Sequence, residues 1–417
     1  MLILNWLLLT IVALAYLGAG VLPGVLPLVA ILACAGCLVT GVCPGGPDRR
    51  LALLAAALVL FLVATALPLP GFMDAAVGHR RAAQNELSRQ AIQDAGKLSL
   101  AHEQVGGFAL TRDRAGTCRT ILMAIAGFAM AAMASRLRQP HAGTFLKALV
   151  ILAAVMAAAG FAGQHLLPQG KSLWWTFPVP HGRPVGCFLN RNHFGGFIAL
   201  LCPAALVLFA TRLGERRFAV ASGWALCFML MTLAIVMSLS RGAWLAYAAS
   251  MFAVVILGLA SRRLLMIAAI ACLLALVAWG VTRLPHEELE ERARSLADPL
   301  SSQTAQMRLS TWRDTLRIVP DYTFVGAGAN AFRMVFPQYR AATTRKSFKH
   351  AENEYLQTAA EWGLVGVALL VGLGVAVAGR WRRYHSRETA DRVIETAVGG
   401  ALIVAAVHAV FDFPLRL

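Results

Sequence analysis

The chain carries little charge, and acidic residues are the scarcer kind. Only 14% of its 417 residues are charged, with 21 Asp and Glu against 38 Lys and Arg, while 58% are hydrophobic. The mean hydropathy is +0.65. A composition this apolar excludes a soluble globular domain and is typical of an integral membrane protein.

Other signals are missing as well. The first segment has no basic region, and apolar sequence resumes directly after Gly18–Gly20, so it does not resemble a cleavable signal peptide. Cys34 and Cys37 have neither His nor carboxylate neighbours, which argues against metal or redox chemistry there. The sequence contains no Asp-x-Asp motif and no internal repeat. No metal site is therefore predicted.

The apolar residues form about eleven runs of roughly 20 residues, each long enough to cross about 30 Å of hydrocarbon. The runs lie near residues 2–18, 21–40, 51–68, 118–134, 144–163, 193–211, 218–239, 242–260, 264–282, 354–378 and 393–412. The sequence therefore predicts an all-α polytopic membrane protein, a bundle of about 11–12 transmembrane helices with short helices in its outer loops.

Short basic loops follow the even-numbered spans. They contain Arg49 and Arg50, Arg136 and Arg138, Arg212, Arg216 and Arg217, Arg262 and Arg263, and Arg380, Arg382, Arg383 and Arg387. By the positive-inside rule, these loops and the N-terminus are cytoplasmic, and the loops after odd-numbered spans face out. Arginines facing anionic lipid also explain much of the formal net charge of +17, in preference to nucleic acid.

Two outer loops are long, residues 69–117 and 283–352. In the second, apolar spacing predicts a helix over Met307–Val319. The glycines of Val325–Phe332 indicate a tight turn, and a second short helix is expected over Ala329–Tyr339. Polar clusters lie in these outer loops and at the outer ends of the spans.

The first cluster is Asn190, Arg191, Asn192 and His193, directly before an apolar span. Either asparagine is able to cap the helix, and interfacial anchoring is the simple alternative for the cluster. A cap alone does not require the arginine and the histidine, so these four residues are candidate binding residues.

Two arginines are candidates for binding an anion. Arg241 lies in the tight turn Ser238–Trp244 between two spans, where a charge is costly unless it reaches headgroups or has a partner. Its guanidinium presents a fork of donors that matches a phosphate. Arg308, on the predicted helix of the second long loop, looks like an ordinary exposed arginine when taken alone.

The fourth cluster precedes and opens the span near 354–378. Glu354, Gln357 and Glu361 share one helix face, because they are three and four residues apart. His350 and Glu352 lie just before this helix, where either a helix-capping box or a general base accounts for them.

The fifth cluster is His408 and Asp412, at the outer end of the last span. They are four residues apart and therefore lie on one helix face, within reach of a hydrogen bond. Ionisable groups facing a bundle interior indicate a functional site, and a structural pair that locks helices together is an equal alternative.

Taken together, these residues resemble the O-antigen ligase and polymerase superfamily of bacterial envelope glycosyltransferases. The motifs are the asparagine-rich start of the sixth span, SRGAW, Arg308 with Trp312, VGAGANAF, ENEYLQTAAEWGLVG and HAVFDF. The resemblance runs from about residue 166 onward. It divides the chain into N-terminal transmembrane helices over 1–165, with the loop 69–117, and a catalytic region over 166–417, with the loop 283–352.

The resemblance implies a GT-C-like, metal-independent glycosyltransferase without cofactor, in the bacterial inner membrane and with its active site on the periplasmic face. Its partners would be an undecaprenyl-diphosphate-linked glycan, an acceptor glycan or lipid A–core, and membrane lipid, with no nucleic acid. In that family, arginines matching Arg241 and Arg308 hold the diphosphate. Substrate binding is further assigned to Asn190, Arg191, Asn192, His193, Glu354, Tyr355, Gln357, His408 and Asp412.

The catalytic base is the point at which this chain departs from the family. The commoner pattern places a histidine at position 352, where this chain has Glu352, and His350 lies two residues earlier. The imidazole slightly favours His350 as the base, with Glu352 close behind.

The sequence is compatible with more than one function. Ligation and polymerisation differ in the acceptor, which the sequence does not show, and a protein hydroxyl acceptor is a further alternative. A non-catalytic transporter or flippase of lipid-linked glycans would need polar residues at mid-depth in several spans, and the spans carry almost none.

Overall fold

The computed structural model describes residues 57–64, 111, 113–134, 137, 141–166, 172–173, 177–178, 185, 188, 190–257, 267, 271, 303–341, 348–383 and 389–412. The predicted spans near 2–18 and 21–40 lie outside these residues. Most of the span near 264–282 and most of the loop 69–117 lie outside them as well.

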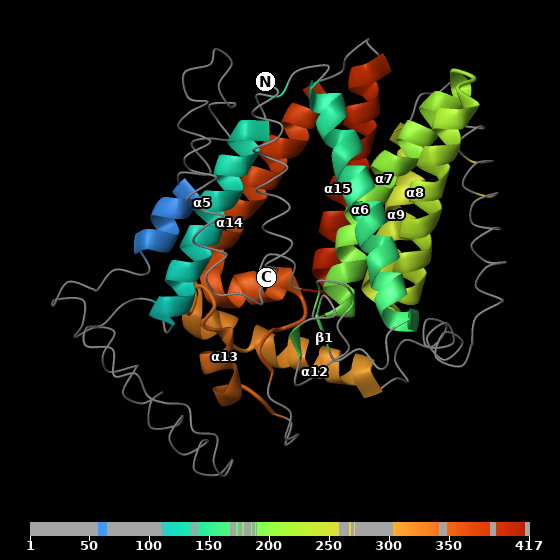
Figure 1. The fold of residues 1–417 in the computed structure, drawn as a ribbon. Coiled ribbons are helices and arrows are strands. Elements are labelled where there is room, and N and C mark those ends of the chain that lie inside the picture. Colours follow the sequence, from blue (N-terminus) through green and yellow to red (C-terminus); the bar gives the residue numbers. More distant parts are fainter. Residues whose placement is uncertain are drawn as a thin grey trace.

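Long helices dominate the described chain (Figure 1). They are α5 (Arg114–Ala134), α6 (His141–Leu166), α7 (Arg191–Gly214), α8 (Phe218–Met237), α9 (Arg241–Leu257), α14 (Glu354–Arg383) and α15 (Thr389–Phe411). Two strands of two residues, β1 (Ser172–Leu173) and β2 (Phe177–Pro178), pair antiparallel between α6 and α7. Among the residues described, six helices are long and apolar enough to cross a membrane. The predicted all-α polytopic membrane protein is confirmed.

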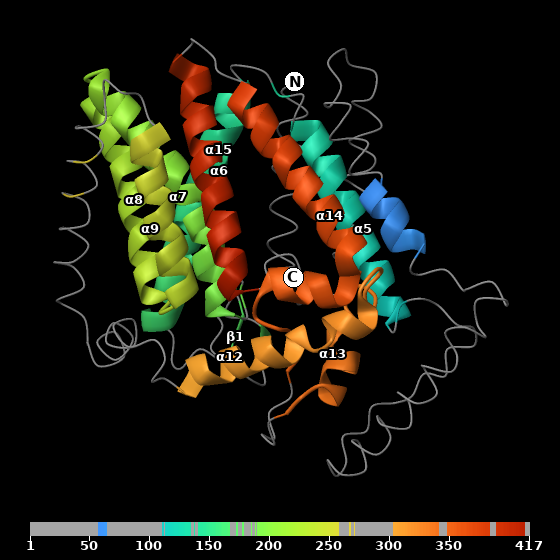
Figure 2. The same cartoon turned by 180° about the vertical axis from the view of Figure 1, so that it is seen from behind.

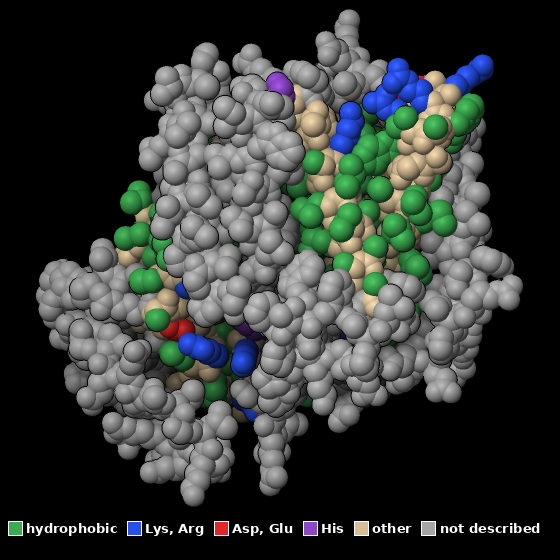
Figure 3. All heavy atoms as spheres, in the orientation of Figure 1, with side chains coloured by type: hydrophobic (Ala, Val, Ile, Leu, Met, Phe, Trp, Pro, Cys, Tyr) green, Lys and Arg blue, Asp and Glu red, His purple; other side chains and the backbone are tan. Residues whose placement is uncertain are grey.

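Helix α7 forms the centre of a bundle with α6, α8, α9 and α15 (Figures 1 and 2). Small residues allow the close packing: a side chain at Gly196 would overlap the ring of His408, and one at Gly400 would overlap Pro203. The outward faces are apolar, as with Phe218 and Phe252. Figure 3 shows hydrophobic side chains over α6 and α8, as expected of surfaces that face lipid.

A second group of helices contains α5, most of α14 and the helical segment 57–64. Leu58, Leu62, Ala329 and Trp362 form its core. The span predicted near 354–378 is not one continuous helix, because α14 breaks at Gly363, which has φ 59° and ψ −165°. Its first part runs across the end of the molecule, and the rest rises beside α5 (Figure 1).

Short helices cover the same end of the molecule. The predicted helix over Met307–Val319 is α12 (Gln303–Leu316), followed by the 3-10 helix η2 (Val319–Tyr322). The predicted tight turn is present, with positive φ at Gly326 and Gly328. The second short helix is present as well: it consists of α13 (Phe332–Val335) and the 3-10 helix η3 (Phe336–Gln338). A side chain at Gly326 would overlap the backbone of α14, so this turn packs directly on α14.

Candidate functional site

Three of the predicted clusters meet where α7, α9 and α15 end together. Arg191 begins α7, Arg241 begins α9, and Asp412 follows the last residue of α15. The three helices pack against one another, and a side chain at Gly242 would overlap Phe411. The basic residues between α7 and α8 lie at the opposite end of the bundle, where Figure 3 shows Lys and Arg side chains gathered.

Asp412 joins α7 to α15. One of its carboxylate oxygens lies 3.2 Å from Nε2 of His193, and the other lies 3.7 Å from Nε2 of His408. The second distance is too long for a hydrogen bond. All three side chains are buried. The pair predicted within one helix is therefore a three-residue cluster between two helices, and this arrangement fits the helix-locking alternative.

Asn190 caps α7. Its side-chain oxygen accepts a hydrogen bond of 2.9 Å from the backbone N–H of Asn192, and its amide nitrogen lies 3.5 Å from Nε2 of His193. A helix cap was predicted for one of the two asparagines, and Asn190 has this role. Arg191 and Asn192 are half-buried at the same helix start.

The turn before Arg241 is fixed by serines. Leu239 has φ 53°, Ser238 Oγ donates to the carbonyl of Ile235 at 2.7 Å, and Ser240 Oγ accepts from the backbone N–H of Ala243 at 3.3 Å. These bonds, with the indole N–H of Trp244 that donates to the carbonyl of Ile235 at 2.9 Å, close the α8–α9 connection. They place Arg241, which is half-buried, at the first position of α9.

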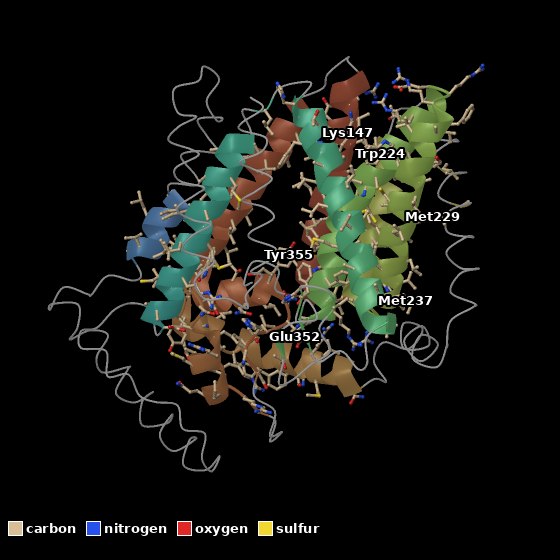
Figure 4. All side chains as sticks on the ribbon, viewed as in Figure 1. Lys147, Trp224, Met229, Met237, Glu352 and Tyr355 are labelled. Carbon is tan, nitrogen blue, oxygen red and sulfur yellow. The ribbon has the colours of Figure 1, made fainter. Side chains whose placement is uncertain are left out.

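Arg308 and Glu352 form an ion pair across 44 residues of sequence. Nε of Arg308 donates to a Glu352 carboxylate oxygen at 2.7 Å. Glu352 has φ 53°, a conformation that non-glycine residues rarely adopt. Tyr355, three residues after Glu352, donates to the backbone carbonyl of Ala406, so the pair lies near the end of α15. Figure 4 shows Glu352 and Tyr355 at the start of α14, at the end of the bundle where α12 lies.

His350 contacts a different set of residues. Its Nδ1 lies 3.4 Å from the amide nitrogen of Gln357, and Gln357 donates at 2.9 Å to Glu361. Glu361 in turn accepts from the backbone N–H groups of Asn330 and Phe332. The polar face predicted for this helix is buried, at Glu354, Gln357 and Glu361. These side chains therefore bond to other groups of the protein.

The remaining predicted residues on α14 also have protein partners. Glu354 lies 3.5 Å from the hydroxyl of Thr358, and Tyr355 donates to the backbone carbonyl of Ala406 on α15 at 2.9 Å. The phenol therefore links the first part of α14 to α15.

Two polar residues that were not predicted from the sequence support this end of the molecule. Asn353 caps α14: its side-chain oxygen accepts a hydrogen bond of 3.1 Å from the backbone N–H of Leu356. Helix capping is the role that the sequence suggested for His350 and Glu352. Asp113 accepts from Gly116 at the start of α5 and pairs with Arg333 at 3.2 Å. Asn or Asp before a helix is a recognised capping signal, so both were detectable.

Residues 226–371 match a family model described as O-Antigen ligase. This match confirms the resemblance to the O-antigen ligase and polymerase superfamily. It supports a membrane glycosyltransferase of the O-antigen ligase and polymerase type at family level, with a lipid-linked glycan and an acceptor as general partners. The matched segment contains Arg241, Arg308 and Glu352, while Asn190–His193 and Asp412 lie outside it. No curated protein matches the chain.

Proposed function

We propose that this protein transfers a glycan from an undecaprenyl-diphosphate carrier to an acceptor hydroxyl at the periplasmic face of the bacterial inner membrane. The reaction serves O-antigen ligation or polymerisation of O-antigen or exopolysaccharide. The observation that carries this proposal is the ion pair between Arg308 and Glu352, which lies inside the matched segment. The helix that follows Glu352 bonds to α15 near the end that packs against the start of α9. A cation and a carboxylate in contact supply a diphosphate ligand and a proton acceptor.

Arg241 and Arg308 bind the diphosphate in this proposal. A guanidinium donates two parallel hydrogen bonds to phosphate oxygens and stays charged at every relevant pH. As the bond from sugar to diphosphate breaks, negative charge grows on the leaving oxygen, and both arginines stabilise that charge. They supply the positive charge that a metal ion provides in other transferases.

Glu352 is the base that the contacts favour. The acceptor hydroxyl oxygen attacks the anomeric carbon, the carbon–oxygen bond to the diphosphate breaks, and the hydroxyl proton moves to the carboxylate. The leaving undecaprenyl diphosphate keeps the electron pair of the broken bond. His350 contacts Gln357 behind the pair, whereas Glu352 touches Arg308 directly.

The test compares wild type with Arg241→Ala, using purified protein in detergent and a polyprenyl-diphosphate glycan. Arg241→Ala should abolish release of polyprenyl diphosphate while the protein stays folded, and Arg212→Ala, at the opposite end of α7, should leave it unchanged. A ladder of longer lipid-linked chains identifies a polymerase, and release only with lipid A–core identifies a ligase. Tight substrate binding without release with any acceptor contradicts a transferase and favours transport.

A further inference from the structure

We propose that Glu352 occupies the phosphate position of Arg308 until the donor arrives, so that binding of the diphosphate releases Glu352 as the base. This inference rests on the proposed function. It makes one contact serve two successive steps: the arginine exchanges a carboxylate for a diphosphate, and the freed carboxylate accepts the proton of the acceptor hydroxyl.

The contact itself suits an exchange. It joins one guanidinium nitrogen, Nε of Arg308, to one carboxylate oxygen of Glu352 at 2.7 Å. The side chains are 19% and 37% exposed, so an anion from outside reaches both. Ion pairs with this much solvent contact contribute little stability, and a single-point contact contributes less than the two-point contact that a phosphate makes.

The backbone of Glu352 also favours release. Its φ of 53° is unfavourable for a residue with a side chain, and it precedes Asn353, which caps α14. The segment is therefore held in place by the cap, and the carboxylate is presented from a strained position beside it.

The exchange imposes an order on the reaction. While Glu352 is paired, one of its two carboxylate oxygens is bonded to Nε of Arg308. Once a diphosphate occupies the arginine, both carboxylate oxygens are free to accept a hydrogen bond from the acceptor hydroxyl. The carboxylate is thus fully available as a base only after the donor has bound.

The experiment measures binding of undecaprenyl diphosphate, without sugar, to the purified full chain in detergent. Glu352→Gln removes the competing charge and should tighten binding by about three- to tenfold. Glu352→Gly, which suits the left-handed φ, should give a similar gain and is the second variant if the glutamine protein fails to fold. The control Glu215→Gln removes a carboxylate paired with Arg212 at the other end of α7, and its binding should equal that of wild type.

A double-mutant cycle shows whether the competition acts through Arg308. In an Arg308→Gln background, Glu352→Gln should give no further gain. Unchanged or weaker binding in both Glu352 variants, or an equal gain without Arg308, overturns the exchange.

Transfer assays on the same preparations separate this inference from the proposed function. Glycan transfer by Glu352→Gln should fall by about 10²- to 10⁴-fold while binding tightens. If binding tightens but wild type transfers to no acceptor, Glu352 does compete with the diphosphate for Arg308, while its role as a base and the proposed function fail. If wild type transfers and binding does not change, the function stands and the exchange fails.

Discussion

At the scale of single residues, the Glu361 carboxylate connects three segments of the site. It accepts hydrogen bonds from the backbone N–H groups of Asn330 at 2.7 Å and Phe332 at 3.0 Å, and from the amide of Gln357 at 2.9 Å. Gln357 in turn accepts from the backbone N–H of Ala351, next to Glu352. The position of the Arg308–Glu352 pair therefore depends on a carboxylate that does not touch it.

Removal of that carboxylate should destabilise the protein. In Glu361→Ala, the buried backbone N–H of Phe332 and the partly buried N–H of Asn330 lose their acceptor, and an unsatisfied buried group costs about 1–3 kcal/mol. We expect a clearly lower Tm in thermal unfolding of the detergent-purified protein. Glu215→Ala, an exposed carboxylate, should stay within about 0.5 kcal/mol of wild type. Equal Tm values for the two variants would show that Glu361 is dispensable.

His350 and Glu352 should differ in their effect on the rate of transfer. Because Glu352 touches the proposed diphosphate ligand, Glu352→Ala should lower kcat by about 10²- to 10⁴-fold, the usual cost of losing a general base. His350→Ala should cost less than about tenfold, since His350 contacts Gln357 instead. Steady-state kinetics with a saturating donor measures both. The opposite order would return the base to His350.

At the scale of elements, the first part of α14 is directed by one glycine. Gly363 has a positive φ, and a side chain there would lie 2.5 Å from the carbonyl oxygen of Phe324 and 2.6 Å from the nitrogen of Gly326. Backbone N–H groups just after the break bond to the loop, from Leu364 to Thr323 and from Val365 to Phe324. The break thus fixes the segment Glu354–Trp362 across the end of the molecule.

Alanine at Gly363 should be destabilising, and alanine at another glycine of α14 should not. Gly363→Ala meets both an unfavourable φ and a backbone overlap, so we expect a loss of at least about 1–3 kcal/mol. Gly374→Ala is the matched control, because none of the described residues lies within 4 Å of a side chain there, and alanine favours a helix interior by roughly 0.5–1 kcal/mol. Tm shifts of opposite sign are expected. A stable Gly363→Ala protein would contradict the packing described here.

Helices were predictable from the sequence where one local pattern of residues determines their position. The span expected near 193–211 is α7, Arg191–Gly214, because a long apolar run specifies a membrane helix. The break at Gly363 was missed, since it lies in an apolar stretch and depends on the loop that packs against it. The contact from Asp412 to His193 and the pair of Arg308 with Glu352 join residues far apart in sequence, so only the folded chain reveals them.

At the scale of the whole molecule, the described chain has two chemically different ends. At one end, Arg212 lies in the last turn of α7 and Arg216 and Arg217 follow the helix; the candidate site residues lie at the other end. Apolar helices of membrane-spanning length separate the two ends. The positive-inside rule then predicts that the candidate site faces the periplasm, where lipid-linked glycans on the outer leaflet are accessible.

Cysteine labelling in intact spheroplasts tests this orientation. Lys349 and Arg216 are both exposed, the first beside the candidate site and the second between α7 and α8. In a variant whose eight native cysteines are replaced by serine, Lys349→Cys should react with a membrane-impermeant thiol reagent, whereas Arg216→Cys should not. Detergent should expose both cysteines, which controls for their intrinsic reactivity. Labelling of position 216 alone in intact cells would reverse the orientation and place the candidate site in the cytoplasm, away from the proposed donor.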